Sequence, residues 1–134
     1  MAIRILIVDN HPIVRAGLTA VLETQPDFAI VGEAANGVQA VERAAALRPD
    51  VIVLDLELPE LDGVAVIQAI RAANSAAKVI VFTVLAIDER ILSAVRAGAQ
   101  GYLLKGAPRE ELFEAIRLVQ SGGSLMPPVV AAWR

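Results

Sequence analysis

The stretch Val51-Ile52-Val53-Leu54-Asp55 is the part of the sequence that says most about the fold. Its first four residues are all apolar, whereas a strand with one face in water would alternate apolar and polar residues. A strand that is buried on both faces is typical of a parallel sheet covered by helices on both sides. Similar short apolar runs occur at residues 3–8, 28–31, 79–82 and 101–104.

Longer segments with apolar residues at helical spacing separate these runs. The alternation predicts five βα units, and therefore an α/β fold with a doubly wound, five-stranded parallel sheet. The first helix is expected to begin near Pro12, the second to end at Arg48-Pro49, the fourth to end at Gly98, and the fifth to span about Pro108 to Gln120. The apolar positions expected on the buried faces of the first two helices are Ile13, Val14, Gly17, Leu18, Val21 and Leu22, and Val38, Val41, Ala45 and Leu47.

The composition limits the class of protein. A chain of 134 residues suits one domain, and charged residues interrupt every apolar stretch well before the roughly 18 residues that would span a bilayer. We therefore expect a soluble protein without an export signal. The absence of cysteine excludes disulfides and thiolate metal sites and is compatible with a cytoplasmic location. A net charge of −3 argues against a nucleic-acid-binding surface on this chain.

Polar side chains stand where four of the predicted strands end. Asp9 follows the first strand, Asp55 the third, Thr83 the fourth and Lys105 the fifth. Each has an ordinary explanation when taken alone, such as helix capping for an aspartate or a surface position for a lysine. However, the carboxyl ends of parallel strands meet at one edge of the sheet, where ligands of such folds bind. Their joint arrival at that edge favours a functional site.

These four side chains suit phosphoryl transfer to a carboxylate. A carboxylate can act as the nucleophile toward phosphorus. Mg²⁺ typically binds one or two carboxylates together with phosphate oxygens, and Asp9 and Asp55 offer such ligands. The ammonium of Lys105 and the hydroxyl of Thr83 would stabilise the remaining phosphoryl oxygens.

The segments around these residues resemble the signature blocks of the receiver domains of bacterial two-component response regulators, in the expected order. The segments are Ile7-Val8-Asp9-Asn10-His11, Asp55-Leu56-Glu57-Leu58-Pro59-Glu60-Leu61-Asp62-Gly63, Val81-Phe82-Thr83 and Gly101-Tyr102-Leu103-Leu104-Lys105. The resemblance covers residues 3–121. The start Asp9-Asn10-His11-Pro12 and the end Gly101-Tyr102-Leu103-Leu104-Lys105 are further similar to the NarL/LuxR-type subfamily.

The resemblance implies a flavodoxin-like or CheY-like (βα)5 fold with strand order 2-1-3-4-5. It implies that Asp55 accepts a phosphoryl group from a sensor histidine kinase or a small phosphodonor. Mg²⁺ would be held by Asp9, Asp55, the backbone carbonyl of Glu57 and, where the family usually has a second acid, Asn10. Lys105 would pair with the phosphoryl group.

The resemblance also implies a switch. Thr83 would turn its hydroxyl toward the new phosphate, and Tyr102 would change rotamer in step. The face made by the fourth helix, the fifth strand and the fifth helix would change with them, because phosphorylation adds about −1.5 to −2 of charge. Beyond its own phosphorylation and dephosphorylation, no enzymatic activity is implied.

The domain organisation expected from the resemblance is a receiver domain at residues 1–121 and a linker or tail at 122–134, which contains Pro127-Pro128 and Trp133. In the NarL/LuxR-type subfamily such a tail leads to a helix-turn-helix DNA-binding domain, which we expect to be absent from this chain. The implied partners are the kinase or phosphodonor and a second copy after phosphorylation. DNA would be bound only through the absent domain, and no membrane contact is implied.

Several departures and alternatives stay open. Asn10 puts the metal affinity in doubt, and the bulky Val84 is expected to restrict the access of donors or of attacking water. The acidic Glu57 is expected to slow or assist dephosphorylation, in a direction that the residue does not reveal. His11 is the only histidine, and we interpret it as a local hydrogen-bonding residue at a helix start. The arginines and glutamates of the last two helices, Arg117 among them, are interpreted first as a solvated surface.

Three other functions compete with the phosphoacceptor. The chain could be a pseudo-receiver, an interaction module that works without phosphate because Asn10 weakens the metal site. A phosphohydrolase with an aspartyl intermediate would normally carry an Asp-x-Asp motif, but position 57 is Glu. A flavodoxin-type flavin domain would need a phosphate-cradling loop rich in Ser, Thr and Gly after the first strand, and the sequence has none there.

Overall fold

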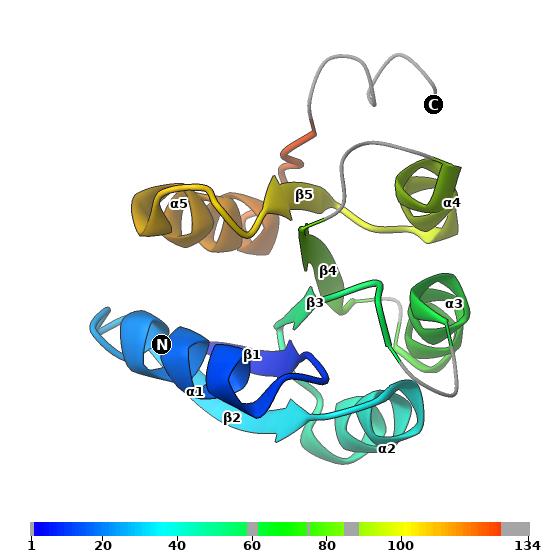
Figure 1. The fold of residues 1–134 in the computed structure, drawn as a ribbon, viewed down its shortest axis with the longest axis horizontal. Helices are drawn as coiled ribbons and strands as arrows, with labels where there is room; N and C mark the ends of the chain where they lie inside the picture. Colours follow the sequence, from blue (N-terminus) through cyan, green and yellow to red (C-terminus); the bar gives the residue numbers. More distant parts are fainter. Residues whose placement is uncertain (1, 59–61, 75, 85–88, 127–134) are drawn as a thin grey trace.

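Five parallel strands form one sheet in the order β2-β1-β3-β4-β5 in the computed structural model (Figure 1), which describes residues 2–58, 62–74, 76–84 and 89–126. This order confirms the predicted topology. The strands are β1 (Ile3–Val8), β2 (Phe28–Ala34), β3 (Val51–Leu54), β4 (Lys78–Thr83) and β5 (Gly101–Leu104).

Helices cover both faces of the sheet, and each follows the strand of the same number. They are α1 (Pro12–Leu22), α2 (Gly37–Leu47), α3 (Gly63–Ala73), α4 (Glu89–Ala97) and α5 (Arg109–Gln120). Helices α1 and α5 lie on one face, and α2, α3 and α4 lie on the other (Figure 1). The fold is therefore doubly wound, as the sequence predicts.

The two faces of the strands supply two separate hydrophobic cores. In β3, Ile52 and Leu54 belong to the core under α2, α3 and α4, whereas Val51 and Val53 belong to the core under α1 and α5. All four side chains are at most 1% exposed. This two-sided burial explains why the central strand is apolar at every position.

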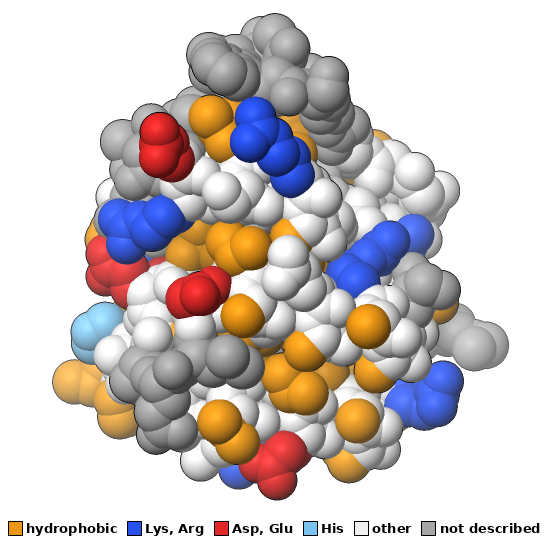
Figure 2. All heavy atoms as spheres, turned by 90° about the vertical axis from the view of Figure 1, so that its right-hand side faces the viewer, with side chains coloured by type: hydrophobic (Ala, Val, Ile, Leu, Met, Phe, Trp, Pro, Cys, Tyr) orange, Lys and Arg blue, Asp and Glu red, His pale blue; other side chains and the backbone are white. Residues whose placement is uncertain are grey.

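The outer surface over α2, α3 and α4 mixes apolar and charged side chains (Figure 2). Apolar groups are spread over the middle of this face, and lysine, arginine and acidic side chains lie among and around them. Among the residues that the structure describes, no helix is both long and apolar enough to cross a membrane.

Side-chain caps and one glycine fix where the helices begin and end. The Oδ1 of Asn36 accepts a hydrogen bond from the backbone N–H of Gln39 (2.9 Å) at the start of α2, and the Oδ1 of Asp62 accepts one from Ala65 N–H (2.9 Å) at the start of α3. Gly98 has φ +120°, a conformation that favours glycine, directly after the end of α4.

The predicted buried faces of α1 and α2 are partly wrong. Ile13 is 86% exposed, and α2 buries Ala40 and Ala44 while Val38 is 46% exposed and Ala45 also faces solvent. The reason is that α2 approaches the sheet through its alanines, so that the larger apolar side chains fall at the borders of the contact stripe. Apolar spacing alone does not distinguish the centre of such a stripe from its borders.

Strand β2 extends three residues beyond the predicted end at Val31. Its pairing with β1 shifts register between Ile5 and Leu6, which pair with Ile30 and Gly32, so Val31 is the extra residue of a bulge. The polar and small residues after the bulge continue the pairing to Ala34. The interruption of the apolar run therefore marked a bulge instead of the strand end.

Leu125 pairs with the sheet, although it lies in the stretch expected to be a linker. Its N–H donates to the carbonyl of Gln100 (2.9 Å), and its carbonyl accepts from Tyr102 N–H (3.0 Å). Gly101 and Leu125 thus form a parallel bridge at the edge of β5. The rest of the expected tail, residues 127–134 with Trp133, lies outside the described residues, as does the Pro59-Glu60-Leu61 part of the signature segment.

Candidate functional site

The polar residues predicted at the strand ends meet at one edge of the sheet. Asp9 follows β1, Asp55 follows β3, and Thr83 is the last residue of β4 instead of the first after it. Asp9 is 1% exposed, Asp55 2% and Thr83 0%, and these three are the buried polar or charged residues of the described part of the chain. Burial of polar side chains requires partners, and the sheet edge provides them.

Lys105 joins the two aspartates. Its Nζ lies 2.6 Å from Oδ2 of Asp9 and 2.9 Å from Oδ2 of Asp55. Lys105 follows β5, and its backbone N–H donates a hydrogen bond to the carbonyl of Thr83 (2.8 Å). This bond fixes the backbone position from which the lysine side chain reaches across β4 to the two acids. One ammonium thus bridges two buried carboxylates.

Besides the contact of its Oδ2 with Lys105, Asp9 has hydrogen-bond partners at its Oδ1 and at its backbone carbonyl. Its Oδ1 accepts a hydrogen bond from the backbone N–H of His11 (2.8 Å) and lies 3.0 Å from the ring Nδ1 of His11. The guanidinium of Arg15 donates to the backbone carbonyl of Asp9 (2.6 Å). The carboxylate is therefore oriented before any ligand arrives.

Opposing effects act on the pKa values of Asp9 and Lys105. Burial raises the pKa of Asp9, but the hydrogen bonds from Lys105 and His11 and the charge of Lys105 together outweigh it, so the pKa lies below its ordinary value. Burial lowers the pKa of Lys105, but the hydrogen bonds to Asp9 and Asp55 and their charges raise it above its ordinary value. The pair is therefore charged at neutral pH.

Asp55 is anchored by the loop that follows it. Its Oδ1 accepts a hydrogen bond from the backbone N–H of Glu57 (3.1 Å), which leaves Oδ2 to Lys105. The side chain of Glu57 is exposed. Glu57 thus contributes its backbone at this point of the site, and its carboxylate faces solvent.

The donor set at this edge fits a hard divalent cation. Asp9 and Asp55 offer carboxylate oxygens, and such ligands suit Mg²⁺. The side-chain oxygen of Asn10 is shielded from solvent and has no hydrogen-bond partner among the described residues. An unsatisfied buried oxygen beside Asp9 in the chain is a further donor that a cation would satisfy.

His11 is a neighbour of the site that the sequence interpretation did not include. Its ring was expected to make a local hydrogen bond, and it does so with the carboxylate of Asp9. Carboxylate oxygens of Asp9 and Asp55 and a ring nitrogen of His11 all lie within 4.8 Å of one another. The spacing of two residues from Asp9 was the available signal, but the same spacing is common at helix starts.

Thr83 and Tyr102 lie on the same face of neighbouring strands. Tyr102 pairs with Val81, whose side chain is in the core under α3 and α4, and Thr83 is two residues further along β4. Tyr102 belongs to that core and is 5% exposed, so its ring is turned inward. Val84, which follows Thr83, is 65% exposed.

Comparisons with known proteins identify the family to which the chain belongs. Residues 5–117 match the family model described as the response regulator receiver domain. The chain is 40% identical over 129 residues to the transcriptional regulatory protein LiaR of Bacillus subtilis and 36% identical over 132 residues to the nitrate/nitrite response regulator protein NarL of Escherichia coli K12. Both alignments cover 96% of this chain and 61% of the relative, so the chain spans about three fifths of the length of these relatives.

A solved structure shows the same fold. The LuxR-family two-component response regulator from Aurantimonas superposes with a TM-score of 0.90 at 36% identity, over 98% of this chain and 94% of that one. The resemblance to NarL/LuxR-type receivers that the sequence motifs indicated is therefore confirmed. The chain belongs to the response regulator receiver domain family of two-component systems.

Proposed function

We propose that this receiver domain accepts a phosphoryl group on Asp55 in a Mg²⁺-dependent reaction. The observation that carries the proposal is the position of the Lys105 ammonium, 2.9 Å from Asp55 and 2.6 Å from Asp9, at the carboxyl edge of the sheet. A buried carboxylate with a cation beside it is placed to attack phosphorus and to have the incoming negative charge compensated.

In the proposed reaction, a carboxylate oxygen of Asp55 forms a bond to phosphorus. The bond from phosphorus to the donor breaks, and the donor leaves as the histidine of a sensor kinase or as a small carboxylate such as acetate. The ammonium of Lys105 moves from the Oδ2 of Asp55 to a phosphoryl oxygen, and the backbone N–H of Glu57 keeps the Oδ1 in place. Attack of water on the phosphorus of the acyl phosphate returns the carboxylate and releases inorganic phosphate.

Asp9, Asp55, the backbone carbonyl of Glu57 and the side-chain oxygen of Asn10 would hold the Mg²⁺. When bound, the ion supplies positive charge for the phosphoryl oxygens. Asp9 is fixed for this task by His11 and Arg15. Asn10 brings an oxygen but no charge, so we expect weak Mg²⁺ binding until phosphoryl oxygens complete the coordination.

Thr83 and Tyr102 form the proposed switch. The hydroxyl of Thr83 turns toward the phosphoryl group, and Tyr102 adjusts its rotamer on the same face of the sheet. The change is passed to the surface made by α4, β5 and α5. The new charge at Asp55 provides the bias between the two states.

The proposed biological setting is a cytoplasmic transcriptional regulator. The relatives LiaR and NarL are longer, and LiaR is named as a transcriptional regulatory protein. We infer that residues 1–121 act as the receiver, that 122–134 lead toward a DNA-binding domain, and that phosphorylation promotes pairing of two copies. DNA would be bound through that further domain.

The test is phosphorylation by acetyl phosphate with Mg²⁺, followed by peptide mass spectrometry. Wild type should carry one phosphoryl group on Asp55, and Asp55→Asn should carry none. Asp62→Asn is the matched control, because Asp62 is an exposed cap of α3. Stable phosphate at His11, or undiminished labelling of Asp55→Asn, would refute the assignment.

A pseudo-receiver is the second candidate, and the missing acid at Asn10 favours it. That function predicts no labelling of Asp55 at any Mg²⁺ concentration and no change with beryllofluoride. The same experiment therefore distinguishes the two functions.

A further inference from the structure

The carboxylate of Asp9 divides its two oxygens between two different neighbours. Oδ2 faces the ammonium of Lys105, and Oδ1 faces the ring Nδ1 of His11 at 3.0 Å. A receiver site that works with Mg²⁺ needs oxygen ligands only. The imidazole nitrogen is therefore a donor that the proposed phosphoryl transfer does not use.

The geometry suits simultaneous binding of one ion by nitrogen and oxygen. Two ligand atoms that are each about 2.1 Å from an ion are about 3.0 Å apart at the right angles typical of Cu²⁺, and about 3.4 Å apart at the tetrahedral angle typical of Zn²⁺. The Asp9 Oδ1 to His11 Nδ1 distance is 3.0 Å, which matches the first value and is close to the second, and a carboxylate oxygen of Asp55 completes a set whose members lie within 4.8 Å of one another. Small side-chain rotations would bring all three onto one ion.

We propose that Asp9, His11 and Asp55 form a binding site for a first-row transition-metal dication such as Zn²⁺ or Cu²⁺, with His11 as the ligand that selects it over Mg²⁺. Imidazole suits Zn²⁺, Cu²⁺ and Ni²⁺, whereas Mg²⁺ prefers oxygen and keeps its waters. The uncharged Asn10 weakens the competing Mg²⁺ without affecting the imidazole. Because the two carboxylates are shared, the transition metal would inhibit the proposed Mg²⁺-dependent phosphorylation.

His11 is exposed, and the hydrogen bond between its ring Nδ1 and Asp9 is the contact that an ion would replace. Its side chain is 57% exposed, and although His11 is the N-cap residue of α1, its side chain makes no capping hydrogen bond within the described residues. Replacing the ring should therefore leave α1 intact. The shielded side-chain oxygen of Asn10, the residue between Asp9 and His11, has no hydrogen-bond partner among the described residues.

Lys105 is the competitor for the same carboxylates. An ion can bind them only if the ammonium releases Oδ2 of Asp9 and of Asp55. Lys105→Gln should therefore strengthen the binding of both Zn²⁺ and Mg²⁺, whereas changes at His11 should affect Zn²⁺ alone. This contrast separates a ligand from a general charge effect.

The chain offers a clean spectroscopic test, since it contains one histidine and no cysteine. Pulsed electron paramagnetic resonance of Cu²⁺ bound to the untagged protein should show coupling to the remote nitrogen of a single imidazole. The signal should vanish in His11→Gln and weaken in Asp55→Ala. Calorimetry should show Zn²⁺ affinity falling about tenfold or more in His11→Gln, with Mg²⁺ affinity changed less than about twofold.

Equal Zn²⁺ affinity in wild type and His11→Gln, or Cu²⁺ spectra without imidazole coupling, would overturn the proposal. An imidazole signal that survives unchanged in Asp55→Ala would show that the ion binds His11 without the proposed set, which also overturns it. These readouts need no phosphorylation. The metal proposal and the phosphoacceptor role of Asp55 can therefore fail independently.

Discussion

Lys105 Nζ lies 2.9 Å from Oδ2 of Asp55, so the residue after β5 is tied to the residue after β3 across the intervening strand β4. The same ammonium is 2.6 Å from Asp9. One positive charge therefore compensates two negative charges, and the edge of the sheet keeps an excess of negative charge. This excess of negative charge attracts cations to the site. It also means that the lysine should contribute more to stability than either acid does.

Lys105→Met should destabilise the protein more than Asp55→Asn. Removing the lysine leaves two buried carboxylates without their cation, and breaking such a pair costs about 3 kcal/mol. Asp55→Asn removes one of two acids and keeps the contact between Lys105 and Asp9, so its effect should stay within about 1 kcal/mol. Urea unfolding at pH 7 without divalent ions measures both. A larger loss in Asp55→Asn would show that Lys105 does not serve both acids.

The effect of Lys105→Met should depend on pH. The folded pKa of Asp9 lies below its ordinary value of 3.8, so the stability gained from its ionisation is present above that value and is lost as the pH falls through the folded pKa. The folded pKa of Lys105 lies above 10.5, so its contribution is present below 10.5 and is lost as the pH rises through the folded pKa.

The difference in unfolding free energy between wild type and Lys105→Met should therefore be constant across the neutral range and shrink at both extremes. Unfolding titrations from acid to alkaline pH check this expectation. A difference that grows as the pH falls below 3.8 would have the wrong sign for a lowered Asp9 pKa.

Asn10→Asp should tighten Mg²⁺ binding and weaken the metal-free protein. Two unit charges about 4 Å apart interact by about 4 kcal/mol at an effective dielectric of about 20, and a divalent ion doubles this gross value. Desolvation cancels much of it, and a net gain of about 1.4 kcal/mol gives a tenfold higher affinity.

Without metal, the new carboxylate would lie beside Asp9 with no further cation, so stability should fall by about 1–2 kcal/mol. Calorimetric Mg²⁺ titration and urea unfolding with and without Mg²⁺ measure the two effects. Indistinguishable Mg²⁺ affinities would place position 10 away from the metal. Asn74→Asp, at the far end of α3, is the control for a charge change alone.

The sequence predicted the features that follow from residue type along a strand and from the parallel arrangement of the strands. The run Val51–Leu54 could be recognised because a strand buried on both faces has no polar position. The meeting of Asp9, Asp55 and Lys105 could be predicted because the carboxyl ends of parallel strands share an edge. In both cases the argument needs only the topology.

Contacts between distant side chains could not be predicted in this way. Arg117, interpreted as part of a solvated surface, is partly exposed but also makes two hydrogen bonds of 2.9 Å to Asp27 and places its guanidinium 4.8 Å from the centre of the Phe28 ring. Arg117 is 90 residues from Asp27 in the chain, and no local pattern predicts their contact. The hydrogen bonds with Arg117 hold the pKa of Asp27 below its ordinary value.

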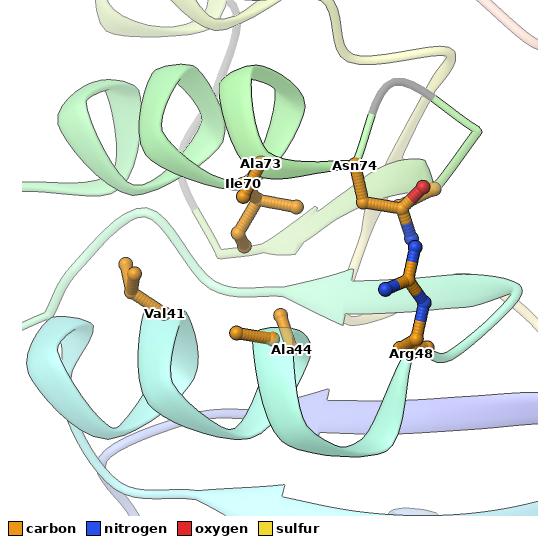
Figure 3. Close-up of a pocket in the computed structure, with 8 residues that line it drawn as sticks. Val41, Ala44, Arg48, Ile70, Ala73 and Asn74 are labelled. Carbon is orange, nitrogen blue, oxygen red and sulfur yellow. The ribbon is translucent and has the colours of Figure 1, made fainter.

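Arg48→Gly should stabilise the protein. Arg48 ends α2 in the left-handed conformation, with φ 49° and ψ 59°, which costs a non-glycine residue about 1–2 kcal/mol. Glycine avoids this strain, but it gives the unfolded chain more conformational freedom, which lowers stability by about 0.5–1 kcal/mol. The unfolding free energy should therefore rise by a net amount of about 0.5–1 kcal/mol. The exposed side chain borders a small cavity of about 80 Å³ between α2 and α3, where it extends toward Asn74 (Figure 3).

Thermal or urea unfolding measures the gain. Gly98→Ala is the opposite control, because φ is +120° there and the new Cβ would lie 3.0 Å from Nε of Arg71. That change should lower stability by about 1–2 kcal/mol. A loss of stability in Arg48→Gly would show that the Arg48 side chain contributes more to packing around the cavity than its conformation costs.

The chain that ends after Met126 should be more stable than the chain that ends after Ser121. The longer chain keeps the hydrogen bonds of Leu125 with Gln100 and Tyr102, worth about 1 kcal/mol each, and part of the apolar area of a half-buried leucine. Ordering the extra backbone offsets some of this gain. We expect a net difference in unfolding free energy of about 1–2 kcal/mol, and Leu125→Ala in the longer chain should cause only the part of this loss that comes from the side chain.

Amide hydrogen exchange is the decisive measurement for this prediction. The Tyr102 N–H donates to the Leu125 carbonyl, so it should lose protection in the shorter chain but not in Leu125→Ala. Equal stability of the two chains, with the Tyr102 amide equally protected, would place the end of the folded receiver at Ser121 and leave Leu125 outside it.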